Sequence, residues 1–280
     1  MYDVILNIMK RFFTRLSKNI FVQGSFIMTF ASFVIGFLNY IFNSLTARAL
    51  GPSGYGELAG FISYTTILSI PLGIIGSMLV LKIGKAEDKI SFSKSLLDWF
   101  NSLFLKYWYV FAIFLMITPL MPRITNLENW FAYLILPMMI LSLLSTIYDG
   151  VMQGLHLFLI FSILNIVSTL LKLGGALTVF FWKNNAIYII LFLLLSGIVK
   201  LVLSRYIFKN KHKKLTNSNL IFKSPNLLKI WKNKMFLLTT LSTSSIALIS
   251  NIDMMYVKKF FSSEDGIKKN QSTDYSVLYL

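Results

Sequence analysis

Cysteine is absent from the 280 residues, and acidic residues are scarce, with 11 Asp and Glu against 27 Lys and Arg. Without cysteine the chain has no disulfide and no cysteine-ligated metal. Charged residues make up 14% of the chain, whereas ordinary globular domains carry about 25%. Because 56% of the residues are hydrophobic, the chain cannot cover itself with a water-compatible surface. The composition indicates a polytopic membrane protein.

Long apolar segments make up most of the sequence, and a membrane-spanning helix needs about 20 mostly apolar residues. Seven segments qualify: 22–46, 57–81, 103–121, 130–148, 158–182, 186–207 and 235–257. We therefore predict an all-α integral membrane protein with seven transmembrane helices.

The formal net charge of +16 raises the question of a nucleic-acid partner, but its distribution argues against one. Most Lys and Arg lie in the N-terminal arm, after the second span and after the sixth. The alternate connections hold only Arg48, Arg123 and Lys183. Because Lys and Arg accumulate on the cytoplasmic side, we expect a multi-pass cell-membrane protein with a cytoplasmic N-terminus and no nucleic-acid partner.

Two cytoplasmic segments have the pattern of helices that lie on a membrane surface. Segment 1–21 has apolar residues at helical spacing beside Lys10 and Lys18, and 220–234 places Trp231 among lysines. Such helices bind an anionic inner leaflet, so membrane lipids are expected partners. A positively charged tether with no further role explains both segments equally well.

The second span contains Pro71, Gly73 and Gly76. Proline removes a backbone hydrogen bond and bends a helix. In a transporter these residues would form a gating hinge. A static kink, relieved by neighbouring helices, is the simpler interpretation.

An internal repeat relates the first span to the seventh. A shift of 210 residues places FNSLTARALGPSGYG (42–56) on IDMMYVKKFFSSEDG (252–266) without gaps. The register pairs similar polar or charged residues, Asn43 with Asp253 and Arg48 with Lys258. Many transporters are built from repeats, and this one predicts a second bundle that begins near residue 235.

TARALGPSGYGELA after the first span and NIDMMYVKKFFSSEDG in the seventh resemble the two half-starts of the polysaccharide flippases. These proteins belong to the multidrug/oligosaccharidyl-lipid/polysaccharide (MOP) superfamily, and the resemblance extends to about residue 266. It implies two six-helix bundles around a cavity that opens alternately to either side. The implied substrate is a lipid-linked oligosaccharide on polyprenyl pyrophosphate, and other polysaccharide-assembly proteins are candidate partners.

The chain departs from the family pattern at its C-terminus. The second half-motif usually continues as Gly-x-Tyr, but here Gly266-Ile267 is followed by KKNQSTD and then YSVLYL. We therefore expect a C-terminally truncated chain. Its expected parts are a cytoplasmic amphipathic segment, the first six-helix bundle, a basic cytoplasmic linker and the start of the second bundle: 1–21, 22–208, 209–234 and 235–280.

Polar residues inside two spans are candidates for the substrate site, because a lipid-facing polar group in hydrocarbon is costly. In the first span, polar or small residues recur every three or four positions: Ser25, Thr29, Ser32, Gly36, Asn39 and Asn43. We interpret residues 25–36 as a packing stripe. Asn39 and Asn43 are interpreted as cavity-lining residues.

The fifth span has the clearest polar face: Ser162, Asn165, Ser168, Thr169, Lys172, Gly175 and Ala176. Lys172 lies about 21 Å along this helix, where a lysine costs about 3 kcal/mol unless it finds water or a partner. A lysine in a hydrated cavity would partly offset the cost of burying a pyrophosphate. We favour this interpretation over a structural pairing of Lys172 with a carboxylate or a helix C-terminus.

Charged residues near span ends are weaker candidates. Arg48 and Lys258 would meet the substrate phosphate on release, although snorkelling to lipid headgroups is the simpler interpretation. Asp253 would pair with a lysine or bind a coupling cation. Lys200 and Lys106 are expected to snorkel. The glycine-rich turn at 51–56 should let two antiparallel spans reverse.

A flippase that works by alternating access fits these observations best. A multidrug-extrusion antiporter of the same superfamily would want a carboxylate inside the first bundle, where none lies mid-span. A membrane-bound polysaccharide polymerase or glycosyltransferase needs placed acids and bases, and the only histidines are His156 and His212. We therefore expect that the protein is not an enzyme and that it binds no metal and no cofactor. A non-transporting fragment or scaffold is a further alternative.

Overall fold

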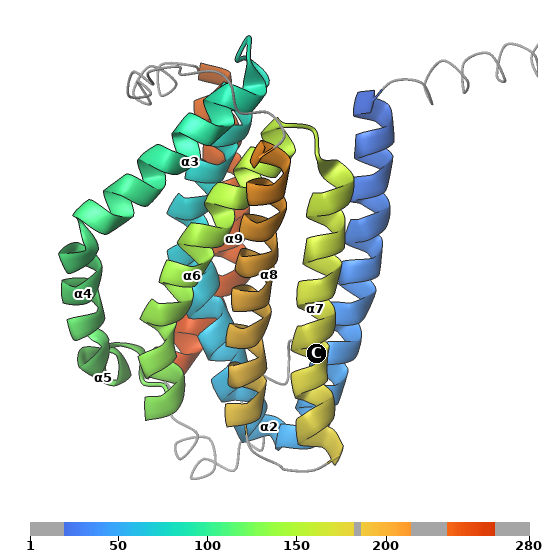
Figure 1. Ribbon diagram of the computed structural model, residues 1–280. Helices are drawn as coiled ribbons and strands as arrows, with labels where there is room; N and C mark the ends of the chain where they lie inside the picture. Colours follow the sequence, from blue (N-terminus) through green and yellow to red (C-terminus); the bar gives the residue numbers. More distant parts are fainter. Residues whose placement is uncertain (1–19, 182–185, 214–233, 261–280) are drawn as a thin grey trace, which may run out of the picture.

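The computed structural model describes residues 20–181, 186–213 and 234–260, and all regular structure in these ranges is helical. The elements are α2 (Ile20–Gly84), α3 (Lys89–Lys106), α4 (Trp108–Met116), η1 (Thr118–Leu120), α5 (Met121–Thr125), α6 (Asn129–Gly154), α7 (Phe158–Phe181), α8 (Ile187–Lys213) and α9 (Lys234–Phe260). Helix α2 packs against α6, α7 and α9, and α8 packs against α6 and α7, so that these helices form a bundle (Figure 1). The expected surface segment 1–21, the amphipathic linker at 220–234 and the tail after residue 260 lie outside the described residues, apart from their helical ends.

Helix α2 folds back on itself where the glycine-rich turn was expected to reverse the chain. Its arms, Val22–Pro52 and Gly54–Gly84, run in opposite directions (Figure 1). Gly51 has φ 68° and ψ −178° and is the residue of α2 that departs from helical geometry. This backbone conformation is essentially restricted to glycine, because a Cβ would clash. The reversal is therefore confirmed, and among the described glycines only Gly51 has a positive φ.

Gly51→Ala should lower the free energy of unfolding by about 1–3 kcal/mol, because alanine would have to adopt this strained backbone conformation. Gly36→Ala, in the first arm of α2, is the matched control. A Cβ at Gly36 would meet no atom within 4 Å, and alanine favours a helix by about 1 kcal/mol over glycine. Unfolding by SDS in mixed micelles, followed by tryptophan fluorescence, measures both. Equal effects at the two positions would contradict the role of Gly51.

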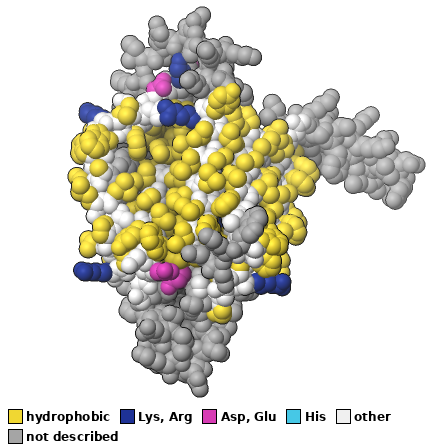
Figure 2. Space-filling model, turned by 60° about the horizontal axis from the view of Figure 1, so that its bottom comes forward, with side chains coloured by type: hydrophobic (Ala, Val, Ile, Leu, Met, Phe, Trp, Pro, Cys, Tyr) yellow, Lys and Arg dark blue, Asp and Glu magenta, His cyan; other side chains and the backbone are white. Residues whose placement is uncertain are grey.

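Five helical stretches are long and apolar enough to cross a membrane: Val22–Pro52, Gly54–Gly84, Asn129–Gly154, Phe158–Phe181 and Ile187–Phe208. They agree with five of the seven expected spans and indicate a multi-pass membrane protein. Figure 2 shows hydrophobic side chains over most of one face, with charged side chains at its upper and lower margins. Helix α9 covers the seventh expected span, but it is rich in Ser and Thr and is not among the five.

The expected third span at 103–121 is wrong as a single helix, since it is divided among α3, α4 and η1. Helix α3 begins well before the apolar run. The Asp88 carboxylate caps it by accepting hydrogen bonds from two backbone N–H groups, at 3.1 and 3.2 Å. The helix ends at Tyr107, whose backbone is no longer helical. A side-chain cap sets a helix start regardless of where the apolar residues begin.

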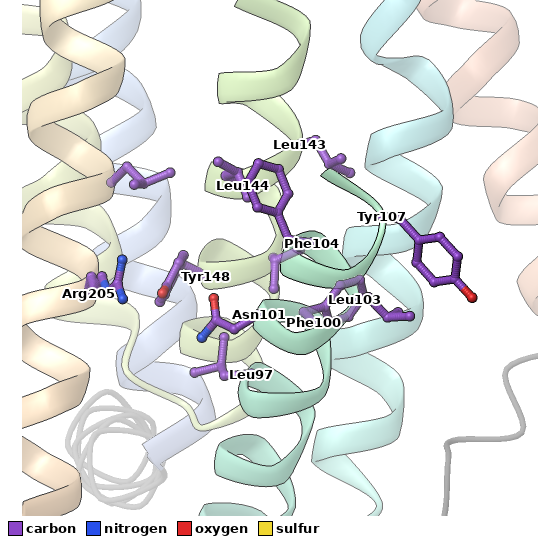
Figure 3. A pocket seen from close by; sticks show the side chains of 12 residues that line it. Leu97, Phe100, Asn101, Leu103, Phe104, Tyr107, Leu143, Leu144, Tyr148 and Arg205 are labelled. Atoms are coloured by element: carbon purple, nitrogen blue, oxygen red, sulfur yellow. The ribbon is translucent and has the colours of Figure 1, made fainter. Parts of the chain in front are cut away.

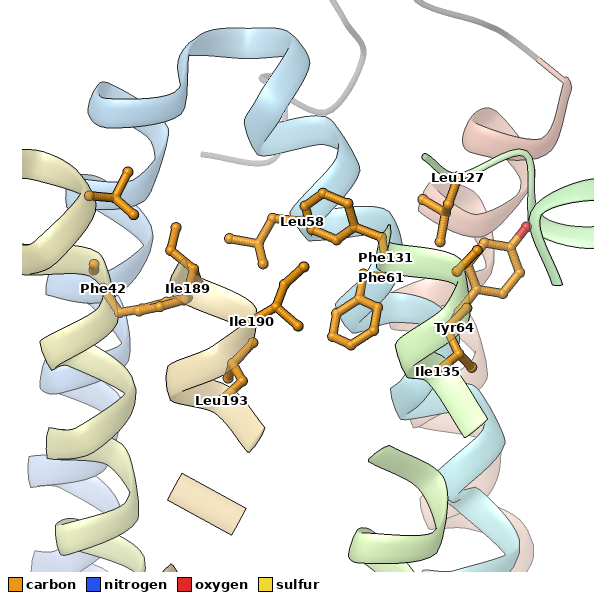
Figure 4. Packing of buried hydrophobic residues seen from close by; sticks show 13 residues of the cluster. Phe42, Leu58, Phe61, Tyr64, Leu127, Phe131, Ile135, Ile189, Ile190 and Leu193 are labelled. Carbon is orange, nitrogen blue, oxygen red and sulfur yellow. The ribbon is translucent and has the colours of Figure 1, made fainter. Parts of the chain in front are cut away.

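Two buried apolar clusters join the helices. The first cluster lies near the turn of α2 (Figure 4) and includes Phe42, Leu58, Phe61, Phe131 and Ile189. The second cluster lies at the opposite end and includes Leu79, Ile83, Leu96, Tyr148 and Phe208. We call this opposite end the basic end, because its connection between α2 and α3 is flanked by lysines: Lys82, Lys85, Lys89 and Lys94.

The expected packing stripe at 25–36 is not found among the described helices. Thr29 and Ser32 are exposed, and Gly36 faces open space. Each hydroxyl donates to a carbonyl of its own helix, at 2.9 and 2.8 Å. Such bonds satisfy a hydroxyl group within a single helix, so the stripe needs no partner helix to remain in an apolar environment.

Candidate functional site

Helix α7 presents its polar face to the rest of the bundle. Ser162, Gly175 and Ala176 are buried, whereas Leu170 and Leu177 on the other side are exposed. Because glycine lacks a side chain, α7 can approach α8 closely at Gly175. A Cβ there would lie 2.6 Å from the Cβ of Phe192. The pattern of small and polar residues therefore identified the inward face of this helix.

Lys172 lies on this face and contacts the first arm of α2. Its Nζ donates a hydrogen bond to Asn39 Oδ1 at 3.1 Å. The same ammonium lies 4.0 Å from the centroid of the Phe42 ring, in cation–π geometry. Two residues that the sequence identified separately as cavity-lining, Lys172 and Asn39, are thus in direct contact.

Asn165, two turns before Lys172 on α7, belongs to a second polar cluster. Lys200 of α8 donates to Asn165 Oδ1 at 2.9 Å and forms an ion pair with Asp149 of α6 at 2.6 Å. The side chains of Lys200 and Asp149 are only 12% and 20% exposed. Three neighbouring helices, α6, α7 and α8, therefore each contribute one residue to a polar cluster inside the bundle.

The expectation that Lys200 snorkels to the membrane surface is wrong. Its ammonium is held by Asp149 and Asn165 and does not extend along the helix toward water. An opposite charge and an amide oxygen replace part of the hydration that the lysine loses on burial. The sequence offered one overlooked signal, since Asp149 is an acidic residue directly after an apolar run in a chain with few acids.

The two polar clusters differ in charge. Asp149 and Lys200 neutralise each other, although Asp149 Oδ1 is buried without a hydrogen-bond partner among the described residues. Lys172 has an amide oxygen and an aromatic ring beside it, but no described carboxylate lies within ion-pair distance. The Lys172 side is therefore the part of the interior that can accept an anion.

The other predicted site residues are less closely connected. Asn43 is half-buried and its backbone carbonyl accepts a hydrogen bond from Thr46 at 3.0 Å. Arg48 is exposed near the turn of α2, and Asp253 is half-buried on α9. The side chain of Lys258 lies outside the described residues. A role of Asn43, Arg48 or Asp253 in substrate binding stays a prediction.

The proposed hinge lies within a continuous stretch of α2. Its second arm keeps helical geometry through Pro71, so the structure contains no break there. Gly73 faces open space, whereas a Cβ at Gly76 would lie 2.9 Å from Thr146 Cγ2 of α6. Gly76 thus permits close packing of α2 on α6. Movement at this segment during transport stays a prediction.

His156 lies in the short connection between α6 and α7, at the basic end. Its Nε2 is 3.1 Å from Lys89 Nζ, and its side chain is exposed. The described residues contain no group of three or more His, Asp or Glu side chains that could hold a metal ion. The candidate functional site is the polar interior formed by the Lys172–Asn39 contact and the cluster of Asp149, Asn165 and Lys200.

Comparisons of the chain with protein-family models, with curated proteins and with solved structures find no match. The function must therefore be inferred from the chemistry of the site and from the resemblance of the two half-motifs. The contacts of Lys172 and of the Asp149–Lys200 pair are the strongest structural observations for this purpose.

Proposed function

We propose that the chain is a membrane transporter of the flippase type. It moves a lipid-linked oligosaccharide on polyprenyl pyrophosphate from the cytoplasmic to the outer face of the cell membrane by alternating access. The observation that carries this proposal is Lys172, a lysine inside an apolar bundle whose described neighbours are an amide oxygen and an aromatic ring. The function assigned is transport and not catalysis.

An anionic headgroup and a lysine each cost free energy when they are buried in the membrane, and contact between them lowers both costs. A lysine at the centre of a spanning helix costs about 2.5–3.5 kcal/mol unless it finds a counter-charge or water. Burial of the substrate's pyrophosphate carries a similar desolvation cost, which contact with the lysine would lower. Outward movement of negative charge across an inside-negative membrane also gains about 2.3 kcal/mol per charge per 100 mV.

Lys172→Gln should slow transport of a pyrophosphate-linked substrate by about tenfold to a hundredfold, because a hydrogen bond to a charged group contributes about 1.5–3 kcal/mol. The measurement uses proteoliposomes that contain a fluorescent polyprenyl-pyrophosphate disaccharide. The fraction that reaches the outer leaflet is read by adding a membrane-impermeant reductant.

Lys106→Gln is the matched control, since Lys106 is an exposed lysine at the end of α3. It should leave the transport rate unchanged. A wild-type chain that moves no substrate, or a Lys172→Gln variant as fast as Lys106→Gln, would contradict the proposed function.

Asp149 favours a second candidate, a multidrug-extrusion antiporter of the same superfamily. Such a protein would want a carboxylate inside the first bundle, and Asp149 lies within α6 with one buried oxygen that has no hydrogen-bond partner among the described residues. An antiporter would expel amphipathic cations in exchange for protons or sodium. Efflux of a fluorescent cation that is lost in Asp149→Asn but kept in Lys172→Gln would favour this function over the flippase.

A further inference from the structure

A cavity separate from the Lys172 and Lys200 contacts opens between α3, α6 and α8 (Figure 3). Its volume is about 410 Å³, within the range of about 300–1,000 Å³ that is usual for ligand sites. The wall is mostly apolar, with side chains such as Leu97, Phe104 and Leu144. A mainly apolar cavity with few polar groups selects a ligand that is itself mainly apolar.

Three polar residues of the cavity lie at one level. Asn101, Tyr148 and Arg205 come from α3, α6 and α8 respectively (Figure 3). On α6, Leu144 precedes Tyr148 by one turn, and on the oppositely directed α3, Phe104 follows Asn101. The cavity therefore has a polar level, with Leu97 on the side of the second apolar cluster and a larger apolar part around Phe104 and Leu144 on the other side.

The polar level faces the basic end of the bundle. Tyr148 and Leu97 belong to the second apolar cluster, together with Ile83 at the end of α2. The lysines that define the basic end flank the same connection. Basic residues accumulate on the cytoplasmic side of membrane proteins, so the polar level should meet the cytoplasmic leaflet.

Arg205 can bind an anion at this level. Its side chain is exposed and, among the described residues, it forms no ion pair. The nearest acidic position on the facing helix is Asp98, one turn before Asn101, and it does not lie within ion-pair distance of Arg205. The guanidinium group can therefore offer a bidentate contact to a phosphate.

We propose that this cavity binds one anionic phospholipid of the cytoplasmic leaflet. An acyl chain lies beside Leu144 and Phe104, and the phosphate contacts Arg205 with Asn101 and Tyr148 as further hydrogen-bond donors. Basic pockets between membrane helices on the cytoplasmic side bind anionic lipid headgroups in this way. The site requires insertion in a membrane with the basic end on the cytoplasmic side, and it does not depend on the transport function.

The test is retention of lipid by the whole chain after extraction from bilayers of equal phosphatidylglycerol and phosphatidylcholine, read by native mass spectrometry. The wild type should keep one phosphatidylglycerol. Arg205→Gln should lower the ratio of bound phosphatidylglycerol to phosphatidylcholine by about tenfold, and Arg205→Lys should restore part of it. Leu144→Trp, which fills the apolar part, should lower retention of both lipids.

Arg123→Gln is the control, because Arg123 is an exposed arginine of α5 at the other end of the bundle. It should retain phosphatidylglycerol like the wild type. The proposal is overturned if Arg205→Gln also retains phosphatidylglycerol like the wild type, or if the wild type keeps both lipids equally. Because Arg205 is exposed, its substitution should leave the helical circular dichroism signal unchanged, and this separates lost binding from lost folding.

Discussion

Asp149→Ala should lower the free energy of unfolding by about 3–5 kcal/mol, because it removes one partner of a buried ion pair. The substitution leaves the Lys200 ammonium with the Asn165 side chain as its remaining described hydrogen-bond partner. Only 12% of the Lys200 side chain is exposed, so water has limited access to the ammonium. An uncompensated charge in the interior is among the most costly single changes in a protein.

The test compares Asp149→Ala, Asp149→Leu, Lys200→Met and the double variant Asp149→Leu with Lys200→Met by SDS unfolding in mixed micelles, with tryptophan fluorescence as the signal. The double variant should be close to the wild type in stability, because an apolar pair of similar volume is often as stable as a buried ion pair. Lys106→Met, at an exposed lysine, should have little effect. A double variant as unstable as the sum of the single variants would show that the charges do not act as a pair.

Gly175→Leu should cost about 3 kcal/mol by forcing α7 away from α8. A Cβ at Gly175 would lie 2.6 Å from Phe192 Cβ and 3.3 Å from Ile189 Cα. Neither atom is the free end of a side chain, so the clash can be relieved only by movement of a helix. Since Asn165 lies on the same helix, this movement would also disturb its hydrogen bond to Lys200.

Gly174→Leu is the matched control for this substitution. A Cβ at Gly174 would meet Phe192 Cε1 at 3.2 Å, which is the outer edge of a ring that can rotate away. Both variants gain similarly in helix propensity, by up to about 1 kcal/mol, so the difference between them isolates the contact with α8. Equal stabilities in the same SDS titration would show that α7 and α8 are not held at this distance.

The sequence alone determined the features that depend on local chemistry. Length and apolarity predicted seven spans, because the thickness of a bilayer sets the length of a span, and five of them are helices long and apolar enough to cross a membrane. The three- and four-residue spacing around Lys172 identified the inward face of α7, because polar groups avoid lipid. The glycine-rich turn at 51–56 predicted the reversal of α2, since one position there needs a conformation that other residues avoid.

Only the tertiary structure decided which polar groups meet. Lys172 and Asn39 are 133 residues apart, and Lys200 and Asp149 are 51 apart. Sequence spacing carries no information about such pairs. For this reason Lys200 was expected at the membrane surface, although it forms an ion pair inside the bundle. For a related reason, the sequence did not show that the expected span at 103–121 is divided among several helices. An apolar run shows which residues avoid water, but capping and packing decide where each helix begins and ends.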